Sequence, residues 1–216
     1  MNVSEALVKR KSIRAFSEKK VDKALIQSLL EKAARSPSGG NVQPWRIYVL
    51  CDSTMLDFKD FLAGQTEPES PEYPIYPTPL SEPYRSSRFK VGEDMYKLLD
   101  IPREDKKARF ARLMENYNFF GAPTAFFCFV DRQMGPPQWS DLGMFLQSFM
   151  LLAVEQGLGT CAQEAWAMRP KSVSEFVSAP DELMLFCGMA IGYPEEAAVN
   201  SLMSDRTPLD NFATFV

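Results

Sequence analysis

The chain has 216 residues, long enough for one fairly large domain or two small ones with a sizeable hydrophobic core. Apolar residues make up 45% and charged residues 24%, as in soluble globular proteins, and the net charge of −4 gives no reason to expect a nucleic-acid partner. The sequence contains no histidine, which excludes zinc sites built on imidazole, Ser-His-Asp triads and any histidine acid or base.

The lack of a recognisable targeting signal and the pattern of the cysteines both favour a cytoplasmic location. Charges interrupt the apolar pattern of the N-terminus, so it is no signal peptide, and the uncharged stretch 142–154 is too short to span a bilayer. The four cysteines show no CxxC spacing and are expected to be free thiols in a reducing compartment. We therefore expect no membrane partner.

Hydrophobic periodicity, turn residues and capping residues predict many helices around a few well-separated strands. In chain order the predicted elements are a helix over 3–9, a helix opened by Asp22, a strand over 45–51, a helix over 56–62, a helix beginning at Pro102, a strand over 125–130, a helix over roughly 138–156, a strand over 183–191 and a strand-like tail, FATFV. Strict βαβ alternation, GxGxxG and GxxxxGK[ST] are missing. This pattern predicts an α+β fold rather than a doubly wound nucleotide-binding fold.

Residues 64–84 form a separate kind of segment. They hold six of the sixteen prolines together with Tyr73, Tyr76 and Tyr84. Proline at this density prevents regular helices and strands, whereas the aromatic residues argue against simple disorder. We expect an ordered excursion that packs over another part of the protein.

Two polar motifs in the first quarter of the chain could bind a ligand. Arg10-Lys11-Ser12-Ile13-Arg14 places three cations and a hydroxyl where a phosphate could be bound, although a solvated basic helix end would look the same. The segment 36–45, SPSGGNVQPW, offers two glycines for close backbone approach and several neutral hydrogen-bonding groups. A polar turn between a helix and a strand is the simpler alternative.

Two further motifs lie in the second half. The segment 157–166, GLGTCAQEAW, follows the predicted buried helix, and its backbone N–H groups could face a ligand unless its glycines merely end that helix. Arg206 lies in the late segment SDRTP, where it could be an ordinary surface arginine.

Taken in order, KRKSIRAF, SPSGGNVQPW, GLGTCAQEAW, IGYP and DRTP resemble the motifs of the nitroreductase family, the FMN-dependent NAD(P)H oxidoreductases. The resemblance covers about residues 3–209 and is weakest over 64–110. It implies one domain over 1–216, with the excursion at about 64–86, and a mixed, mainly antiparallel sheet flanked by helices. It also implies a homodimer in which the C-terminal strand is exchanged to extend the partner's sheet.

The resemblance further implies three groups of FMN-binding residues. Arg10, Lys11, Ser12, Arg14 and Arg206 would hold the phosphate and ribityl chain. The other subunit would contribute a second group, which consists of Pro37, Ser38, Gly39, Asn41 and Gln43. The third group, Glu164 and Ala165, would present backbone N–H groups to the N5 and O4 edge of the flavin. Two positions depart from the family pattern: Ser204 replaces a basic residue found in some relatives, and Ala165 replaces a frequent glycine.

The implied activity is ping-pong transfer of electron pairs from NADH or NADPH to a nitroaromatic, quinone or similar flat small-molecule acceptor, with the flavin, and no catalytic side chain, performing the redox chemistry. Another FMN reaction, such as reductive dehalogenation or flavin cleavage, and a non-catalytic flavin-binding role remain open, as does an interaction protein without a cofactor. We also hypothesise that the excursion is a lid over the acceptor, and that Arg85 and Arg88 select an anionic acceptor such as a nitrobenzoate.

Overall fold

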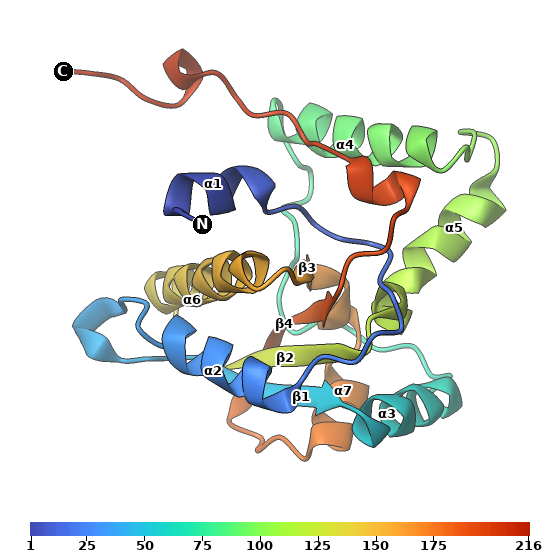
Figure 1. Ribbon diagram of the computed structural model, residues 1–216, viewed down its shortest axis with the longest axis vertical. Helices are drawn as coiled ribbons and strands as arrows, with labels where there is room; N and C mark the ends of the chain where they lie inside the picture. The colour runs from blue at the N-terminus through green and yellow to red at the C-terminus, as the bar shows by residue number, and fades with distance from the viewer.

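A computed structural model describes residues 1–216 and shows a four-stranded sheet in the order β1-β2-β4-β3 (Figure 1). The strands are β1 (Arg46–Cys51), β2 (Thr124–Asp131), β3 (Gly159–Gln163) and β4 (Leu183–Gly192). All three strand pairings are antiparallel, and the one parallel element is an isolated bridge between Ser12 and Thr160. The α+β prediction is confirmed, whereas the prediction of a mixed sheet is wrong for the four strands of a single chain.

The central strand β2 explains why the sheet must be covered on both faces. Its side chains alternate between two buried clusters, with Phe127 and Phe129 in one and Phe126, Cys128 and Val130 in the other. All of these residues are fully buried. A strand that is apolar on both faces requires a layer of helices on each side.

Helices supply these two layers (Figure 1). The face with Phe126 packs against α2 (Lys23–Ala33) and α6 (Pro136–Glu155), and the face with Phe127 packs against α3 (Ser53–Gly64) and α7 (Pro170–Val177). Helix α2 begins where predicted, because the Asp22 side chain accepts a hydrogen bond from the Ala24 N–H at 2.9 Å. Helix α1 (Val3–Lys9) is opened by a capping box between Asn2 and Glu5.

Three elements differ from the sequence prediction. The strand β3 lies in the segment 157–166, where the sequence pattern predicts no strand, and the pattern predicts no helix where α4 (Tyr84–Leu98) lies. Helix α5 (Lys106–Met114) begins after Pro102, because the Asp105 side chain is its N-cap and accepts a hydrogen bond from the Ala108 N–H at 2.9 Å.

A close contact between β4 and the segment after β3 positions the short 3-10 helix η3 (Glu164–Met168). Trp166 is fully buried, and a Cβ at Gly188 would lie only 2.2 Å from Cδ1 of its ring. Only glycine at position 188 leaves this space, so η3 can pack directly against the sheet. Glu164 and Ala165 are thereby held at the end of β3.

The proline-rich excursion contains no regular element over 65–83 and is anchored to the rest of the chain. The hydroxyl of Tyr73 donates a hydrogen bond to the carbonyl of Phe186, and its ring lies 5.2 Å from the ring of Trp139. The Glu69 carboxylate accepts hydrogen bonds from the N–H groups of Lys171 and Ser172 at 2.7 and 3.1 Å. The segment is therefore fixed both beside β4 and at the N-terminus of α7.

The C-terminal tail leaves the body of the protein. After η4 (Ala198–Ser201) the chain runs past α4, forms the short η5 (Leu209–Asn211) and ends well away from the sheet (Figure 1). Residues 212–216 form no strand within the single chain, and Phe215 is 87% exposed. The exchange of this tail between subunits stays a prediction. None of the helices combines the length and the apolar character needed to cross a membrane.

Candidate functional site

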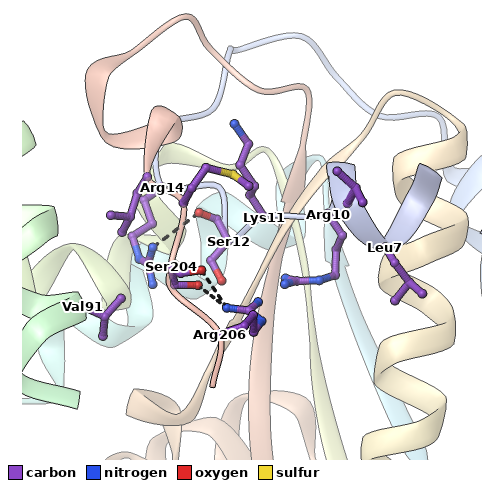
Figure 2. A pocket seen from close by; sticks show the side chains of 11 residues that line it. Leu7, Arg10, Lys11, Ser12, Arg14, Val91, Ser204 and Arg206 are labelled. Atoms are coloured by element: carbon purple, nitrogen blue, oxygen red, sulfur yellow. Dashed lines mark hydrogen bonds between the residues drawn. The ribbon is translucent and has the colours of Figure 1, made fainter. Parts of the chain in front are cut away.

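A cavity of about 400 Å³ opens between the end of α1 and the loop that follows η4 (Figure 2). Its polar lining includes all five residues of the first predicted group, which are Arg10, Lys11, Ser12, Arg14 and Arg206. Four of them come from one short segment, while Arg206 comes from the far end of the chain. The structure therefore brings together the two basic motifs that the sequence keeps almost 200 residues apart.

Backbone contacts fix the early segment against the sheet. Ser12 bridges to Thr160 of β3, and the Ile13 N–H donates a hydrogen bond to the Thr160 carbonyl at 2.9 Å. Ile13 is buried in the core, so the residues on either side of it are turned toward the cavity side of the segment. The strand β3 thus holds the basic segment in place.

Asn200 joins the late loop to the same segment. Its side-chain oxygen accepts a hydrogen bond from the Arg14 N–H at 2.8 Å, and its amide donates to the Ala15 and Glu195 carbonyls at 2.8 and 2.9 Å. The Lys11 ammonium donates to the Asn200 carbonyl at 2.8 Å. Asn200 is only 8% exposed, so these bonds are shielded from water and hold both walls of the cavity together.

The cavity carries positive charge that no carboxylate balances. None of its eleven lining residues is acidic. Burial lowers the pKa of the Arg10 guanidinium, and the nearby Arg206 lowers it further. Figure 2 shows these two guanidinium groups pointing toward one another, which like charges do at a cost unless an anion lies between them. The arrangement fits an anionic group such as a phosphate.

Ser204, which replaces a basic residue found in some relatives of the family that the motifs resemble, has a definite role in this structure. One guanidinium nitrogen of Arg206, Nη1, donates hydrogen bonds to the Ser204 carbonyl at 3.0 Å and to its hydroxyl at 2.7 Å. The other nitrogens of that guanidinium make no hydrogen bond to the protein. Ser204 therefore orients Arg206 and leaves donors free for a ligand (Figure 2).

Sequence reasoning missed two residues that build this site, Asn200 and Arg112. Arg112 of α5 donates to the Arg14 carbonyl at 2.9 Å, and its Nε is buried without a partner. Burial and the neighbouring Arg14 lower the pKa of Arg112. Burial raises the pKa of the Cys161 thiol while Arg14, Arg112 and Arg10 act against it, so the three arginines share one neighbourhood. Neither Asn200 nor Arg112 lies in a recognisable motif, so no sequence signal marks them.

The two residues predicted to face the flavin edge lie outside the cavity, at the beginning of η3. Glu164 is exposed, and Ala165 is partly buried and accepts a hydrogen bond from the Tyr117 hydroxyl through its carbonyl at 3.2 Å. Because η3 directly follows β3, and β3 bridges to Ser12, both residues are held on the same strand that fixes the basic segment.

The remaining predicted residues lie in the loop between α2 and β1 and do not line the cavity of their own chain. These are Pro37, Ser38, Gly39, Asn41 and Gln43, around the 3-10 turn η1 (Gly39–Asn41). The Gln43 N–H donates to the Ser38 hydroxyl at 3.0 Å, and the Gly39 N–H donates to the carboxylate of Asp141 in α6 at 3.2 Å. The loop is thus ordered, and a single chain leaves it apart from the basic cavity.

Comparison with known proteins finds similar sequences over most of the length of the chain. A model described as "Nitroreductase family" matches residues 7–193. A 4-nitrobenzoate reductase of Pseudomonas putida is 32% identical over 96% of this chain and 92% of its own length. A nitrobenzene nitroreductase of Ectopseudomonas oleovorans is 31% identical over 99% of this chain and 96% of its own.

A solved structure matches the fold closely. The FMN and NADPH-dependent nitroreductase NfnB from sphigopyxis sp. strain HMH superposes with a TM-score of 0.96 and 44% identity, covering 100% of this chain and 99% of that one. The match includes α4 and β3, the two elements that the sequence prediction missed.

Proposed function

Since the chain belongs to the nitroreductase family, we propose that it is an FMN-dependent oxidoreductase that transfers electron pairs from NADH or NADPH to nitroaromatic compounds or other flat acceptors. The relatives named as 4-nitrobenzoate and nitrobenzene reductases and the structure named as an FMN and NADPH-dependent nitroreductase support this activity. We propose that the whole of residues 1–216 acts as one unit, in the cytoplasm.

The observation that carries the proposal is the uncompensated positive charge of the 400 Å³ cavity. We assign the FMN phosphate to this cavity, with Arg10, Arg14 and Arg206 as its charged partners and Ser12 as a hydroxyl donor. A phosphate brings two negative charges at neutral pH and would relieve the repulsion between Arg10 and Arg206. Lys11 contributes charge while it holds the late loop through Asn200.

The rest of the flavin site would be completed by a second subunit. In this proposal the loop with Ser38, Asn41 and Gln43 reaches the flavin of the partner chain, which agrees with its separation from the basic cavity of its own chain. The exposed tail would extend the sheet of the partner. Its unpaired, apolar residues Phe212, Phe215 and Val216 support a role in contact with another surface.

FMN held by these residues would supply the two-electron chemistry by which NAD(P)H reduces the acceptor in ping-pong turnover. For a nitro group the first turnover balances as ArNO₂ + NAD(P)H + H⁺ → ArNO + NAD(P)⁺ + H₂O. The backbone N–H groups of Glu164 and Ala165 would donate to the N5 edge. The chain has no histidine, so the additional proton would come from water.

The visible spectrum of the purified protein tests this proposal. We expect a yellow protein whose flavin absorbance is bleached by NADH or NADPH under anaerobic conditions and restored by 4-nitrobenzoate or nitrobenzene. A colourless protein that takes up no FMN would contradict the cofactor assignment. A yellow protein that reduced nicotinamides do not bleach would contradict the enzymatic role.

A further inference from the structure

A second, larger cavity of about 920 Å³ lies under the proline-rich excursion, against α4 and α5. Its lining combines aromatic rings with four arginines and a single carboxylate, Glu93; the aromatic residues are Tyr76, Phe89 and Tyr96, and the arginines are Arg85, Arg88, Arg103 and Arg109. Aromatic rings and guanidinium groups are the side chains that suit a flat, negatively charged ligand.

The four arginines are not equivalent. Arg85 pairs with Glu82 at 2.6 Å, and Arg109 pairs with both carboxylate oxygens of Glu93. Arg88 and Arg103 make no ion pair, and each guanidinium lies over an aromatic ring, at 4.3 Å from the Tyr76 ring and 5.2 Å from the Phe89 ring. A guanidinium that rests on a ring keeps the N–H groups at its edge for a ligand.

Arg88 is connected to the end of β3 through Tyr76. The Arg88 guanidinium lies over the Tyr76 ring, and burial and Glu164 raise the pKa of the Tyr76 hydroxyl while Arg88 lowers it, so both charged groups act on this hydroxyl. Arg88 and Tyr76 also border a neighbouring cavity of about 510 Å³ that contains Ser204 and Arg206. Arg88 thus lies where the excursion cavity meets both Glu164 and the loop of the basic site.

We propose that Arg88 determines acceptor specificity by binding the carboxylate of an aromatic acid, so that the enzyme prefers nitrobenzoates to neutral nitroarenes. This inference rests on the proposed function. The edge of the guanidinium makes paired hydrogen bonds to the carboxylate, and the excursion with Tyr76 provides a flat wall for the ring. The hypothesis that the excursion covers the acceptor fits this placement, whereas Arg85 is engaged by Glu82 and has no part in it.

The position of Arg88 favours the acceptor over the electron donor as the source of the anion. In a nitrobenzoate one aromatic ring separates the carboxylate from the nitro group. In NADPH the 2′-phosphate lies at the opposite end of the dinucleotide from the nicotinamide. The Arg88 guanidinium lies 4.3 Å from the centre of the Tyr76 ring, and Glu164 is near enough to raise the pKa of the Tyr76 hydroxyl, so the shorter molecule fits.

The test compares Arg88→Gln with Arg85→Gln, a matched control three residues earlier on α4. For each protein, kcat/KM is measured with 4-nitrobenzoate and with 4-nitrobenzamide, a neutral molecule of nearly the same shape. We expect Arg88→Gln to lower the ratio of the two values about 10- to 100-fold, because a hydrogen-bonded charge pair is lost. Arg85→Gln keeps the wild-type ratio, and Arg88→Lys lies between the two.

A binding measurement separates this inference from the proposed function. Calorimetry with benzoate, which carries no nitro group, should show weaker binding to Arg88→Gln than to Arg85→Gln whether or not turnover occurs. Equal benzoate affinities and an unchanged ratio overturn the inference while nitrobenzamide reduction upholds the proposed function. If Arg88→Gln raises the KM for NADPH but leaves the ratio of the two kcat/KM values unchanged, the inference is also overturned, and the anion that Arg88 binds is then part of the electron donor. If Arg88→Gln but not Arg85→Gln loses benzoate binding, and the wild-type protein reduces no nitro compound, the anion site is upheld and the proposed activity is overturned.

Discussion

At the scale of single residues, the basic cavity holds positively charged side chains that repel one another, and an anionic ligand can relieve this repulsion. Burial and the positive charge of Arg206 lower the pKa of Arg10, and no carboxylate lines the cavity. A structural arginine cluster would be expected to include acidic partners, as Arg109 has in Glu93. The cluster is therefore better explained by binding than by folding.

This explanation predicts opposite effects on the empty and the FMN-bound protein. Arg10→Gln and Arg206→Gln should each weaken FMN binding about 10- to 100-fold, because each removes charge-assisted hydrogen bonds to the phosphate. The same substitutions should leave the thermal stability of the FMN-free protein unchanged or slightly higher, because like charges are removed. Flavin fluorescence titration and thermal melts of the FMN-free protein measure the two effects.

Lys9→Gln is the matched control, because Lys9 is an exposed cation in the last turn of α1 outside the cavity. It should change neither quantity appreciably. Equal FMN affinity in Arg10→Gln, Arg206→Gln and Lys9→Gln would show that the cavity does not bind the phosphate.

The sequence predicted the cations of this cavity but not the contacts that assemble it. Arg10, Lys11, Ser12 and Arg14 are adjacent in the chain, so one motif marks them all. Arg112 approaches Arg14 only because α5 crosses beside it, and Asn200 matters because its buried amide meets three backbone groups. Such roles depend on tertiary packing, which a pattern in one segment cannot reveal.

At the scale of elements, the missed helix and strand have a common cause. Helix α4 has no buried residue and therefore lacks the apolar face that periodicity detects. The strand β3 is short and begins Gly-Thr, and it becomes a strand through its pairing with β4. The elements predicted well, such as α2 and β2, carry their own apolar pattern.

One of the anchors of the excursion is a buried carboxylate. The Glu69 side chain is 6% exposed, pairs with Arg169 at 3.1 Å, and accepts hydrogen bonds from two N–H groups at the start of α7. It also accepts a hydrogen bond from the Ser172 hydroxyl. This carboxylate joins the excursion to α7 and satisfies backbone donors that the helix itself leaves free.

Glu69→Ala should therefore destabilise the protein by about 2 to 4 kcal/mol, because it leaves a largely buried arginine and helix N–H groups without their partner. Urea unfolding measures this loss, and limited proteolysis should show faster cleavage within 65–83. Glu67→Ala is the control, since the Glu67 side chain is exposed and makes no contact of this kind. If both variants unfolded and were cleaved alike, Glu69 would not be an anchor.

At the scale of the whole molecule, the single chain leaves apolar side chains exposed on α1 and on the C-terminal tail, among other places. Val3, Leu7 and Val8 of α1 are each at least 50% exposed, and Phe212, Phe215 and Val216 of the tail are each at least 69% exposed. Exposed apolar residues gathered on one helix and one tail mark a surface for association. In Figure 1 the tail extends from the body on the same side of the sheet as α1.

Deletion of residues 212–216 tests whether this surface joins two subunits. If the tail extends the sheet of a partner, its removal abolishes backbone pairing and the burial of two phenylalanine side chains, each worth about 1.5 to 3 kcal/mol. We expect a dimer to become a monomer in sedimentation experiments at micromolar concentration, and FMN to be lost with it, since half of the proposed site comes from the partner. Phe215→Ala should weaken the dimer in the same direction without shortening the chain. A deletion variant that stays dimeric and yellow would show that the tail is not exchanged, and one that becomes monomeric while keeping FMN would show that the site is complete within one chain.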